Sequence, residues 1–492
     1  MKIILGPPGT GKTQKLLDMI DLAIEDGMKP EKIGFLAFTR KAAIEAKDRA
    51  KIKFNLPDTK LTYFRTIHSL AFRQLSLSKT QIMQRENYVE LGKALGIAVT
   101  GYVDMSEGSL SYGMETGDRL IFLDGLARTK RVPLRDVWEN CGSDGISWFE
   151  LVRTSDAIKA YKKARGLFDF TDILEMFCQR GYVPELDLLV IDEAQDLSKL
   201  QWEVVHRLIK SANSVIVAGD DDQSIFSWSG ADTDYFINLI GEVQNLEVSW
   251  RVPSKIQDLA LDIVKGISNR RDKTWVSSKE GGGVHWHNDI DTVPLNEGNW
   301  LILARNGYML KQVEDHCMLS GFSFAGRFSP LKSPTLTSIR LWESLRKGDS
   351  ITFDQAKKVL ALMNQRIDLR QLVGFDKIDM KTLEVVAYVK NTRKIWHEAL
   401  DRIPAYEREY FIAARRAGET LVKTPRISVS TIHGAKGGES DNVLLFTDLA
   451  PRTYDEFINR PDDEHRVFYV GVTRAKQDLH LIQPRTNKAF LI

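Results

Sequence analysis

A glycine-rich segment near the start of the chain, Gly6-Pro7-Pro8-Gly9-Thr10-Gly11-Lys12-Thr13, contains residue types that together can bind nucleotide phosphates. Glycines let the backbone curve around a phosphate and turn its N–H groups inward. The Lys12 ammonium can neutralise the charge of the β- and γ-phosphates, and the Thr13 hydroxyl can be a ligand of Mg²⁺. Because all the fixed positions of this motif occur together, we expect a phosphate-binding loop rather than an ordinary Gly/Pro turn.

Two acidic segments could complete the chemistry of a nucleotide site. Asp192 and Glu193 follow the apolar run 186–191. A carboxylate at Asp192 would hold Mg²⁺ largely through water, and Glu193 would orient and deprotonate an attacking water. In the second segment, the Gln223 amide could contact both a γ-phosphate and a water. Three adjacent acids, residues 220–222, precede Gln223, and because they repel one another we do not expect them to be kept for packing.

Two aromatic residues, Phe226 and Trp228, follow at a spacing of two in the same polar segment. Aromatic residues beside a nucleotide site are usually part of the core. Here the polar setting favours stacking on the bases of a single nucleic-acid strand.

The polar residues named above stand at the ends of short apolar runs, which we expect to be strands. In the first half these runs are 3–5, 33–38, 61–64, 186–191, 215–218 and 246–248, and in the second half 300–303, 427–429, 443–446 and 479–482. Helical patterns alternate with them, which predicts parallel sheets covered on both faces. Ligands bind at the carboxyl ends of strands in such sheets. The stretches 76–165 and 331–424 interrupt this alternation with mainly helical patterns.

The composition also indicates in which cellular compartment the protein works and which partners it can bind. No apolar run has the length needed to span a membrane. Cys141, Cys178 and Cys317 lie far apart, which argues against disulfides and zinc and favours a reducing compartment. The net charge is only +2, so a nucleic-acid partner would have to meet local patches. Residues 331–424 form one such patch, with 18 Lys and Arg against 12 Asp and Glu.

The segment Gly-Asp-Asp-Asp-Gln-Ser-Ile-Phe-Ser-Trp at 219–228, after Asp-Glu-Ala-Gln-Asp at 192–196, resembles the UvrD/Rep-type DNA helicases of superfamily 1 (SF1A) in a compact form. Further segments match in the family's order: Phe38–Ala43, Thr66–His68, Phe168–Phe170, Trp250-Arg251, Thr431–Glu439 and Tyr469–Ala475. The resemblance therefore covers both α/β cores, whereas the two insertions match by position only.

The resemblance implies an α/β fold with two RecA-like P-loop NTPase domains, each with a mainly helical insertion, and ATP between the two domains. The first domain would comprise 1–75 and 166–250, with an insertion at 76–165. The second would comprise 251–330 and 425–492, with a reduced insertion at 331–424.

The resemblance also implies roles for individual residues. Lys12, Thr13, Asp192, Glu193 and Gln223 would serve the phosphates, the metal and the water. Arg251 and Arg474 would reach the γ-phosphate, and Glu439 would lie near the ribose or the metal. Trp250 stands in the family's base-stacking position, and Gln14 stands where relatives often have a base-stacking arginine. The DNA path would be lined by Phe38, Thr39, Arg40, Thr66, His68, Phe170, Phe226, Trp228, Thr431 and His433. For each residue of the DNA path alone, packing or capping is an open alternative.

The expected function is an ATP-dependent helicase, with Mg²⁺ and ATP as cofactors, that moves 3′→5′ on single-stranded DNA and separates a duplex. Its partners would be single strands, single/double-strand junctions, and replication or repair proteins. We expect a monomer in the cytoplasm of a bacterial or phage-infected cell, associated with the nucleoid. The reduced second insertion, and Ser229 in place of a common arginine, favour a first alternative, a translocase with little unwinding of its own. A non-catalytic binding subunit and a small-molecule P-loop kinase are further alternatives, and the intact motif series argues against both.

Overall fold

The computed structural model describes residues 1–104, 111–113, 115–141, 145–421 and 424–492, in which the chain forms two compact units. Unit 1 comprises Met1–Gly281 and Asp455–Thr473. Unit 2 comprises Gly282–Tyr454 and Arg474–Ile492. Within the described residues, no helix is both long and apolar enough to cross a bilayer.

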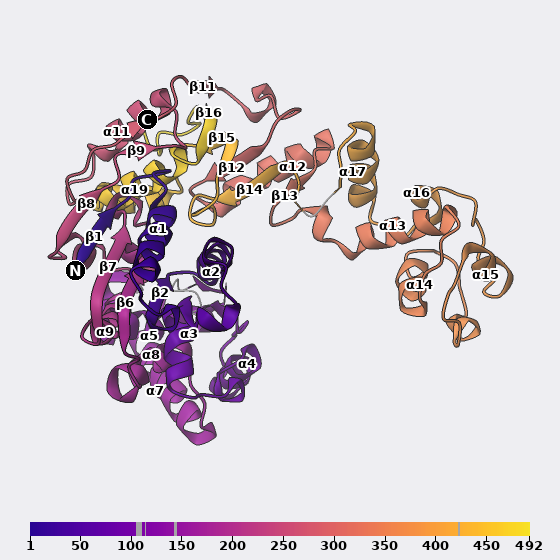
Figure 1. Ribbon diagram of the computed structural model, residues 1–492. Coiled ribbons are helices and arrows are strands. Elements are labelled where there is room, and N and C mark those ends of the chain that lie inside the picture. The colour runs from indigo at the N-terminus through magenta and orange to yellow at the C-terminus, as the bar shows by residue number, and fades with distance from the viewer. Residues whose placement is uncertain (105–110, 114, 142–144, 422–423) are drawn as a thin grey trace. The chain divides into compact units, whose positions relative to one another are not determined.

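A six-stranded sheet with the order β3-β2-β6-β7-β1-β8 forms the centre of unit 1, and all its neighbouring strands are parallel (Figure 1). Its strands are β1 (Lys2–Leu5), β2 (Ile33–Ala37), β3 (Tyr63–Thr66), β6 (Leu186–Ile191), β7 (Ala212–Gly219) and β8 (Glu242–Asn245). Ile3 pairs with Val217 and Leu36 with Ile191, so β1, β2, β6 and β7 end at one edge.

The sheet of unit 1 buries apolar side chains on both faces. On one face Ile4, Phe35 and Val190 pack against α1 (Lys12–Glu25) and α2 (Arg40–Phe54). On the other face Leu5 and Ile191 pack against the remaining helices of the core. These helices are α3 (Ile67–Gln74), α8 (Phe170–Arg180) and α9 (Lys199–Ile209). The alternation follows from the period of two along a strand, and it makes the strands almost continuously apolar.

The segment between α3 and α8 is mainly helical. It contains α4 (Arg85–Leu95), α5 (Thr116–Lys130), α6 (Leu134–Cys141) and α7 (Trp148–Arg165), together with the short antiparallel pair β4 (Val103–Asp104) and β5 (Ser111–Tyr112). Buried charges attach this segment to α8: Arg128 pairs with Asp169 at 2.9 Å and Lys162 with Asp172 at 2.7 Å. The rest of unit 1 comprises α10 (Thr233–Ile237), α11 (Ser254–Val264), α19 (Pro461–Val472) and the parallel pair β9 (Val248–Ser249) and β10 (Val276–Ser277).

A second six-stranded parallel sheet, in the order β11-β16-β15-β12-β14-β13, forms the centre of unit 2. Its strands are β11 (Gly283–His287), β12 (Trp300–Ala304), β13 (Phe324–Ala325), β14 (Ile427–Thr431), β15 (Ser440–Phe446) and β16 (Ala475–Ile482). Helix α12 (Leu310–Ser320) packs on this sheet, and α18 (Pro451–Asn459) follows β15.

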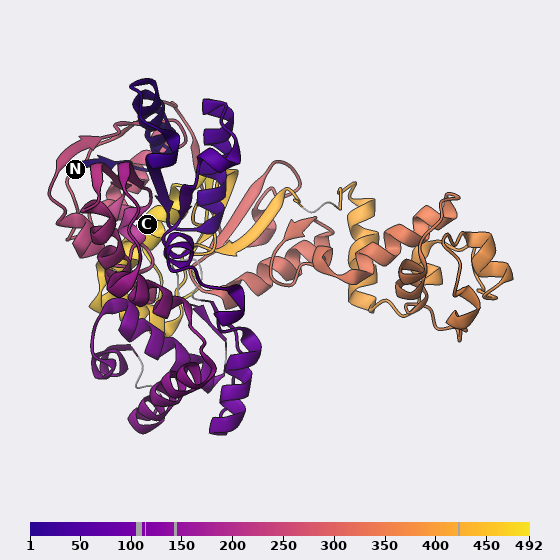
Figure 2. The ribbon, with the colours of Figure 1, turned by 60° about the horizontal axis from the view of Figure 1, so that its bottom comes forward.

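A helical segment lies between β13 and β14 and extends beyond the edge of the sheet at which β13 lies (Figure 2). It contains α13 (Pro334–Arg346), α14 (Phe353–Leu360), α15 (Met380–Val385), α16 (Trp396–Ala399) and α17 (Ala405–Arg416). Its buried residues, such as Trp342 and Phe411, belong to the same apolar cluster as Ile302 and Ile427 of the sheet.

The prediction of parallel sheets flanked by helices is confirmed. The predicted strand at 246–248 is wrong in position, because Leu246 lies between β8 and β9. The sequence analysis also missed the edge strand β11. Most side chains of β8 and β11 are half-buried or exposed, so neither strand has the apolar run of a central strand.

Candidate functional site

The glycine-rich segment forms the connection between β1 and α1, at the carboxyl end of its strand. Gly9 and Gly11 have φ values of 74° and 76°, in the left-handed region that glycine adopts without strain. Gly6 N–H donates to the carbonyl of Gly219 at 3.0 Å, which ties the loop to the end of β7. Helix α1 begins at Lys12, so its first N–H groups and the positive end of its dipole lie at the loop. This is the expected geometry of a phosphate-binding loop.

The Lys12 ammonium lies 3.0 Å from Glu193 Oε1, and the Thr13 hydroxyl donates to Asp192 Oδ2 at 3.0 Å. Burial opposes the charge of Lys12, but Glu193, Asp192 and Asp220 outweigh it and raise the lysine pKa. Burial and the neighbouring Glu193 raise the pKa of Asp192 to about 6. The structure therefore brings together two pairs of adjacent residues, Lys12-Thr13 and Asp192-Glu193, although 179 positions separate Thr13 from Asp192.

A hydroxyl and a carboxylate in contact fit Mg²⁺, which takes one or two protein ligands and completes its shell with phosphate and water. Among the described residues, no group of three or more His, Cys, Asp or Glu side chains is placed to hold a metal ion by itself. Thr13 and Asp192 would hold the ion together with a nucleotide.

Glu193 adopts a left-handed conformation with φ of 56°, which is uncommon for a residue other than glycine. Its N–H donates to Asp192 Oδ1 at 2.9 Å, and its Oε2 accepts from the Gln195 amide at 2.6 Å. Gln195 Oε1 in turn accepts from Asp220 N–H at 3.1 Å. A side chain on Gly219 would put Cβ 2.5 Å from that oxygen, so the contact requires glycine there. Gln195 is fully buried and was not among the predicted site residues, although the segment 192–196 contains it.

The three adjacent acids are buried, so the expectation that they are not kept for packing is wrong. The Lys273 ammonium lies 3.2 Å from Asp220, 2.6 Å from Asp221 and 2.9 Å from Asp222. Arg270 donates to both oxygens of Asp222, at 2.8 and 2.6 Å. Burial opposes the charge of Lys273, but the three carboxylates outweigh it and raise the lysine pKa. Two cations about fifty positions downstream therefore neutralise the cluster, a pairing that no local sequence signal revealed.

Gln223 lies at the end of a 3₁₀ turn, Asp221–Gln223. Its amide nitrogen donates to Asp220 Oδ2 at 2.7 Å. Side chains and backbone thus form a continuous hydrogen-bonded path from Glu193 through Gln195 and Asp220 to Gln223. The residues predicted to orient water and to contact phosphate are fixed relative to one another.

Trp250 and Arg251 also lie against the phosphate loop, within unit 1. Trp250 N–H donates to the Gly9 carbonyl at 2.9 Å, and Ser249 Oγ donates to the Pro8 carbonyl at 2.7 Å. A Cβ on Gly9 would lie 2.3 Å from Arg251 Cβ. Trp250 is 67% exposed, so its side chain is accessible from solvent.

Gln14 lies in the first turn of α1, and its amide has partners on two helices. Its nitrogen donates to Asp18 at 2.8 Å, and its oxygen accepts from Arg49 at 2.7 Å.

Two aromatic pairs contain most of the aromatic residues predicted for the DNA path in unit 1. Phe38 stacks on Phe226 with ring centres 5.8 Å apart, and His68 meets Phe170 edge to face at 6.1 Å. Trp228 stacks on Phe122 of α5 at 6.4 Å and keeps 41% of its surface exposed.

Two of the predicted polar residues of the DNA path have a capping role. Thr39 and Thr66 accept backbone N–H groups at the starts of α2 and α3. Arg40 is exposed at the first position of α2.

The candidate residues of unit 2 follow β14 and β15. Thr431 ends β14 and accepts from Gly434 N–H at 3.1 Å, and His433 is half-buried. Glu439 is exposed, with Lys476 at 3.8 Å. Arg474 donates to the Gly438 carbonyl at 3.4 Å.

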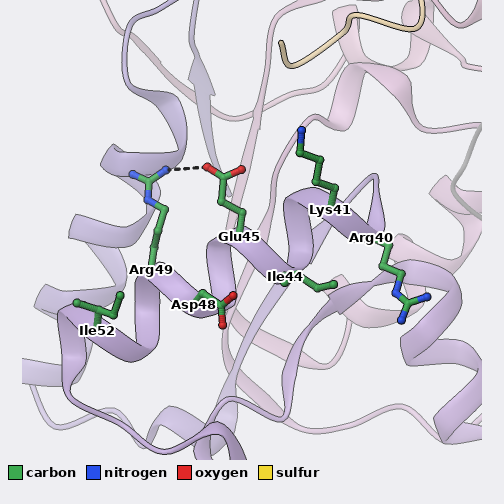
Figure 3. A pocket seen from close by; sticks show the side chains of 7 residues that line it. All are labelled: Arg40, Lys41, Ile44, Glu45, Asp48, Arg49 and Ile52. Carbon is green, nitrogen blue, oxygen red and sulfur yellow. Dashed lines mark ion pairs between the residues drawn. The ribbon is translucent and has the colours of Figure 1, made fainter. Parts of the chain in front are cut away.

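A surface hollow of about 570 Å³ lies along α2, and no residue of the phosphate loop lines it (Figure 3). Arg40 and Lys41 line one end, and Arg49 reaches toward Glu45 at 3.9 Å in the middle. Glu45 and Asp48 line this hollow between Lys41 and Arg49, so it lacks the uniform positive charge of a phosphate site.

Comparison with known proteins identifies the family. Residues 1–228 match the AAA domain family, and residues 384–486 match the UvrD-like helicase C-terminal domain. The chain belongs to the UvrD/Rep-type helicases of superfamily 1. The resemblance inferred from the motifs is confirmed.

Individual relatives of this helicase family differ in how much of their length they share with the chain. A "Probable DNA helicase II homolog" of Rickettsia felis is 22% identical over 615 residues, covering 99% of this chain and 91% of the relative. YjcD of Bacillus subtilis is 25% identical over 56% of this chain and 38% of its own length. "ATP-dependent DNA helicase PcrA" of the same organism is 26% identical over 58% of this chain and 40% of its own length. The chain therefore spans about two fifths of YjcD and PcrA.

His68 should make stability depend on pH. Burial lowers its pKa to about 4, so below pH 6.5 the unfolded chain binds a proton that the native state does not. Stability should therefore fall from pH 6.5 towards pH 4. We expect His68→Gln to reduce the loss of unfolding free energy between pH 7 and pH 4.5 by on the order of 2–3 kcal/mol.

Urea unfolding at the two pH values measures this effect. His397→Gln, at a half-exposed histidine, is the control and should leave the loss unchanged. If wild type and His68→Gln lose the same unfolding free energy between pH 7 and pH 4.5, His68 is not buried in its neutral form.

Proposed function

We propose that this chain is an ATP-dependent DNA helicase that moves 3′→5′ on single-stranded DNA and separates a duplex. The observation that supports this most is the convergence of Lys12, Thr13, Asp192 and Glu193 at the ends of β1 and β6. Such an arrangement can bind Mg²⁺ and a triphosphate and position a water. The substrates would be single strands and single/double-strand junctions in the cytoplasm, at the nucleoid. The chain would act as a monomer, together with replication or repair proteins.

Lys12 would exchange partners during each cycle. Its ammonium is paired with Glu193 at 3.0 Å, and a γ-phosphate would take the place of that carboxylate. Glu193, still held by the Gln195 amide at 2.6 Å, would then be available to accept a proton from the attacking water. Gln223 would contact the γ-phosphate from the neighbouring strand end, and bound Mg²⁺ would supply charge neutralisation.

Arg251 and Arg474 would stabilise the charge that develops on the transferred phosphoryl group. An arginine in that role is worth about 10³–10⁵ in rate. The two RecA-like domains, 1–75 with 166–250 and 251–330 with 425–492, would close during hydrolysis. Closure would alternate their grip on the strand. Glu439 would serve the ribose or the metal, and Trp250 would stack on the base.

The DNA path would run over the aromatic pairs of unit 1 and over Thr431 and His433 of unit 2. In unit 1, Trp228 is 41% exposed, which would let a base stack on it. Thr39 and Thr66 would place backbone and hydroxyl groups near the phosphates while capping their helices, and Arg40 would add a charge.

A single-strand translocase that displaces proteins, with little unwinding of its own, is the second candidate. The compact helical segment at 331–424 favours it, because a short insertion offers less surface for a duplex. Both candidates require the same motor, so an unwinding assay separates them.

Lys12→Ala should abolish DNA-stimulated ATP hydrolysis, because the phosphates lose their main point charge. Single-strand binding without nucleotide should survive. Steady-state ATPase rates with and without single-stranded DNA test this, with Lys15→Ala, three positions further along the same helix, as the control. Hydrolysis near the wild-type rate in Lys12→Ala would exclude the phosphate-loop assignment.

Trp228→Ala should weaken single-strand affinity by about 1–3 kcal/mol, the value of one base–aromatic stack. The matched control is Trp286→Ala, a tryptophan of unit 2 with 43% exposure against 41% for Trp228. Fluorescence anisotropy measures the affinity, and a thermal melt shows whether the loss is instead one of stability. Equal affinities in the two variants would refute stacking at Trp228.

The same proteins test direction on duplexes with a 3′ or a 5′ tail. Wild type should separate only the 3′-tailed substrate, and Trp228→Ala should do so more slowly. Preference for the 5′ tail would contradict the proposed polarity. Translocation without separation of either substrate would favour the second candidate.

A further inference from the structure

The turn that ends at Gln223 is enclosed by cations from two distant parts of unit 1. We call residues Asp220–Gln223 the acid turn, and Arg270, Lys273 and Arg466 the basic clasp. Arg270 and Lys273 bind the carboxylates, as described above. Arg466, from α19, binds the backbone of the turn instead. None of the clasp residues was predicted from the sequence.

Arg466 joins both segments at once. Its Nε donates to the Asp221 carbonyl at 3.0 Å, and a terminal nitrogen donates to the Asn269 carbonyl at 2.6 Å. Arg466 is 5% exposed and Asp221 is fully buried, so the Asp221 carbonyl has little access to water as an alternative partner. The planar fork of arginine can satisfy two carbonyls in fixed directions, which a lysine ammonium on its flexible stem does less well.

The acid turn is connected both to Gln223, which is proposed to contact phosphate, and to the aromatic residues proposed to contact DNA. Upstream, Asp220 holds the Gln223 amide and is itself held by Gln195. Downstream, the chain reaches Phe226 and Trp228 within five residues of Gln223. A shift of the Asp221 carbonyl would therefore move the phosphate-contacting amide and the exposed aromatic ring together.

Helix α19 continues toward a third functional residue. It ends at Val472, and the Thr473 hydroxyl donates to the Tyr469 carbonyl at 2.7 Å, which fixes the end of the helix. Arg474 is the next residue in the chain. The backbone of α19 thus connects Arg466 itself to Arg474, the arginine proposed to act on the γ-phosphate.

We propose that Arg466 is a positioning residue that couples DNA binding to hydrolysis by tying the acid turn to α19. It touches neither nucleotide nor DNA in this role. The inference rests on the proposed function, because it assigns Gln223, Trp228 and Arg474 the roles given there. The competing interpretation, which we call the staple, is that the Arg466 contacts only stabilise the fold.

A neighbouring arginine provides a matched control. The Arg271 guanidinium also donates to two backbone carbonyls, those of Phe236 and Leu239, and is also partly buried. Its side chain does not bind the acid turn in these contacts. The Arg271 backbone N–H donates to Asp221 Oδ2 at 2.8 Å, and a lysine at this position keeps that bond. Arg271→Lys therefore removes only a guanidinium fork that binds the Phe236 and Leu239 carbonyls and leaves the contact with the acid turn in place.

The experiment compares Arg466→Lys with Arg271→Lys and wild type. It measures kcat and KM for ATP, with and without an oligo-dT strand, at a temperature where circular dichroism shows each protein folded. We expect Arg466→Lys to lower the DNA-stimulated kcat about tenfold or more, with KM within about threefold and the basal rate little changed. Arg271→Lys should stay close to wild type in all three. If Arg466→Lys does not fold, Arg466→Gln, whose amide can still serve one carbonyl, takes its place.

The outcomes separate the two hypotheses. Wild type without DNA-stimulated hydrolysis would refute the proposed function itself. If DNA stimulates ATP hydrolysis in wild type, and Arg466→Lys and Arg271→Lys have equal DNA-stimulated kcat, the coupling role of Arg466 is refuted while the proposed function stands. A lower melting temperature with unchanged stimulation, or an equal loss of basal and stimulated rates, would also overturn it in favour of the staple. Loss confined to the stimulated kcat supports coupling.

Discussion

The site depends on the neutralisation of carboxylates that the parallel sheet of unit 1 buries at its carboxyl edge. Asp192, Asp220, Asp221 and Asp222 are each at most 3% exposed. A buried charge without a partner is strongly destabilising, so every one of these acids requires a cation or a set of hydrogen bonds. Lys12, Lys273 and Arg270 supply the cations, and their positions determine how the loops after β1, β6 and β7 can fold.

These cations fall into two groups with different consequences. Glu193, the partner of Lys12, has a side chain 32% exposed, so this pair is accessible from solvent, as the proposed exchange of the carboxylate for a phosphate requires. The side chains of Lys273 and the three acids of the turn are at most 1% exposed, so neither water nor a ligand has ready access to that pairing. The first group is suited to exchange with a ligand. The second keeps Gln223 in place while the exchange occurs, because Asp220 holds the Gln223 amide.

Sequence patterns predicted what depends on neighbouring residues and missed what depends on distant ones. The order strand, glycine-rich loop and helix at residues 2–25 was visible because it is local, as were the apolar strands that lead to Asp192 and Gly219. Strand β8 was predicted at the wrong position and β11 was missed, because edge strands bury few side chains and lack an apolar run. The repulsion argument failed for the three acids because Lys273 and Arg270, about fifty positions away, neutralise them.

The contacts around the charged turn restrain the segment that contains Phe226 and Trp228. Ser224 Oγ donates to the Gln195 carbonyl at 2.9 Å and lies 2.6 Å from Thr233 Oγ1, so the chain between Gln223 and Trp228 is anchored at its start. Phe226 packs on Phe38, just after β2, and this contact anchors the middle of the segment between Gln223 and Trp228. Trp228, stacked on Phe122, remains exposed beyond these anchors. A base that stacks on Trp228 would therefore displace one end of a short, anchored segment whose other end is Gln223. Because the segment is anchored, a displacement of Trp228 would be transmitted to Gln223 rather than absorbed by movement of the loop.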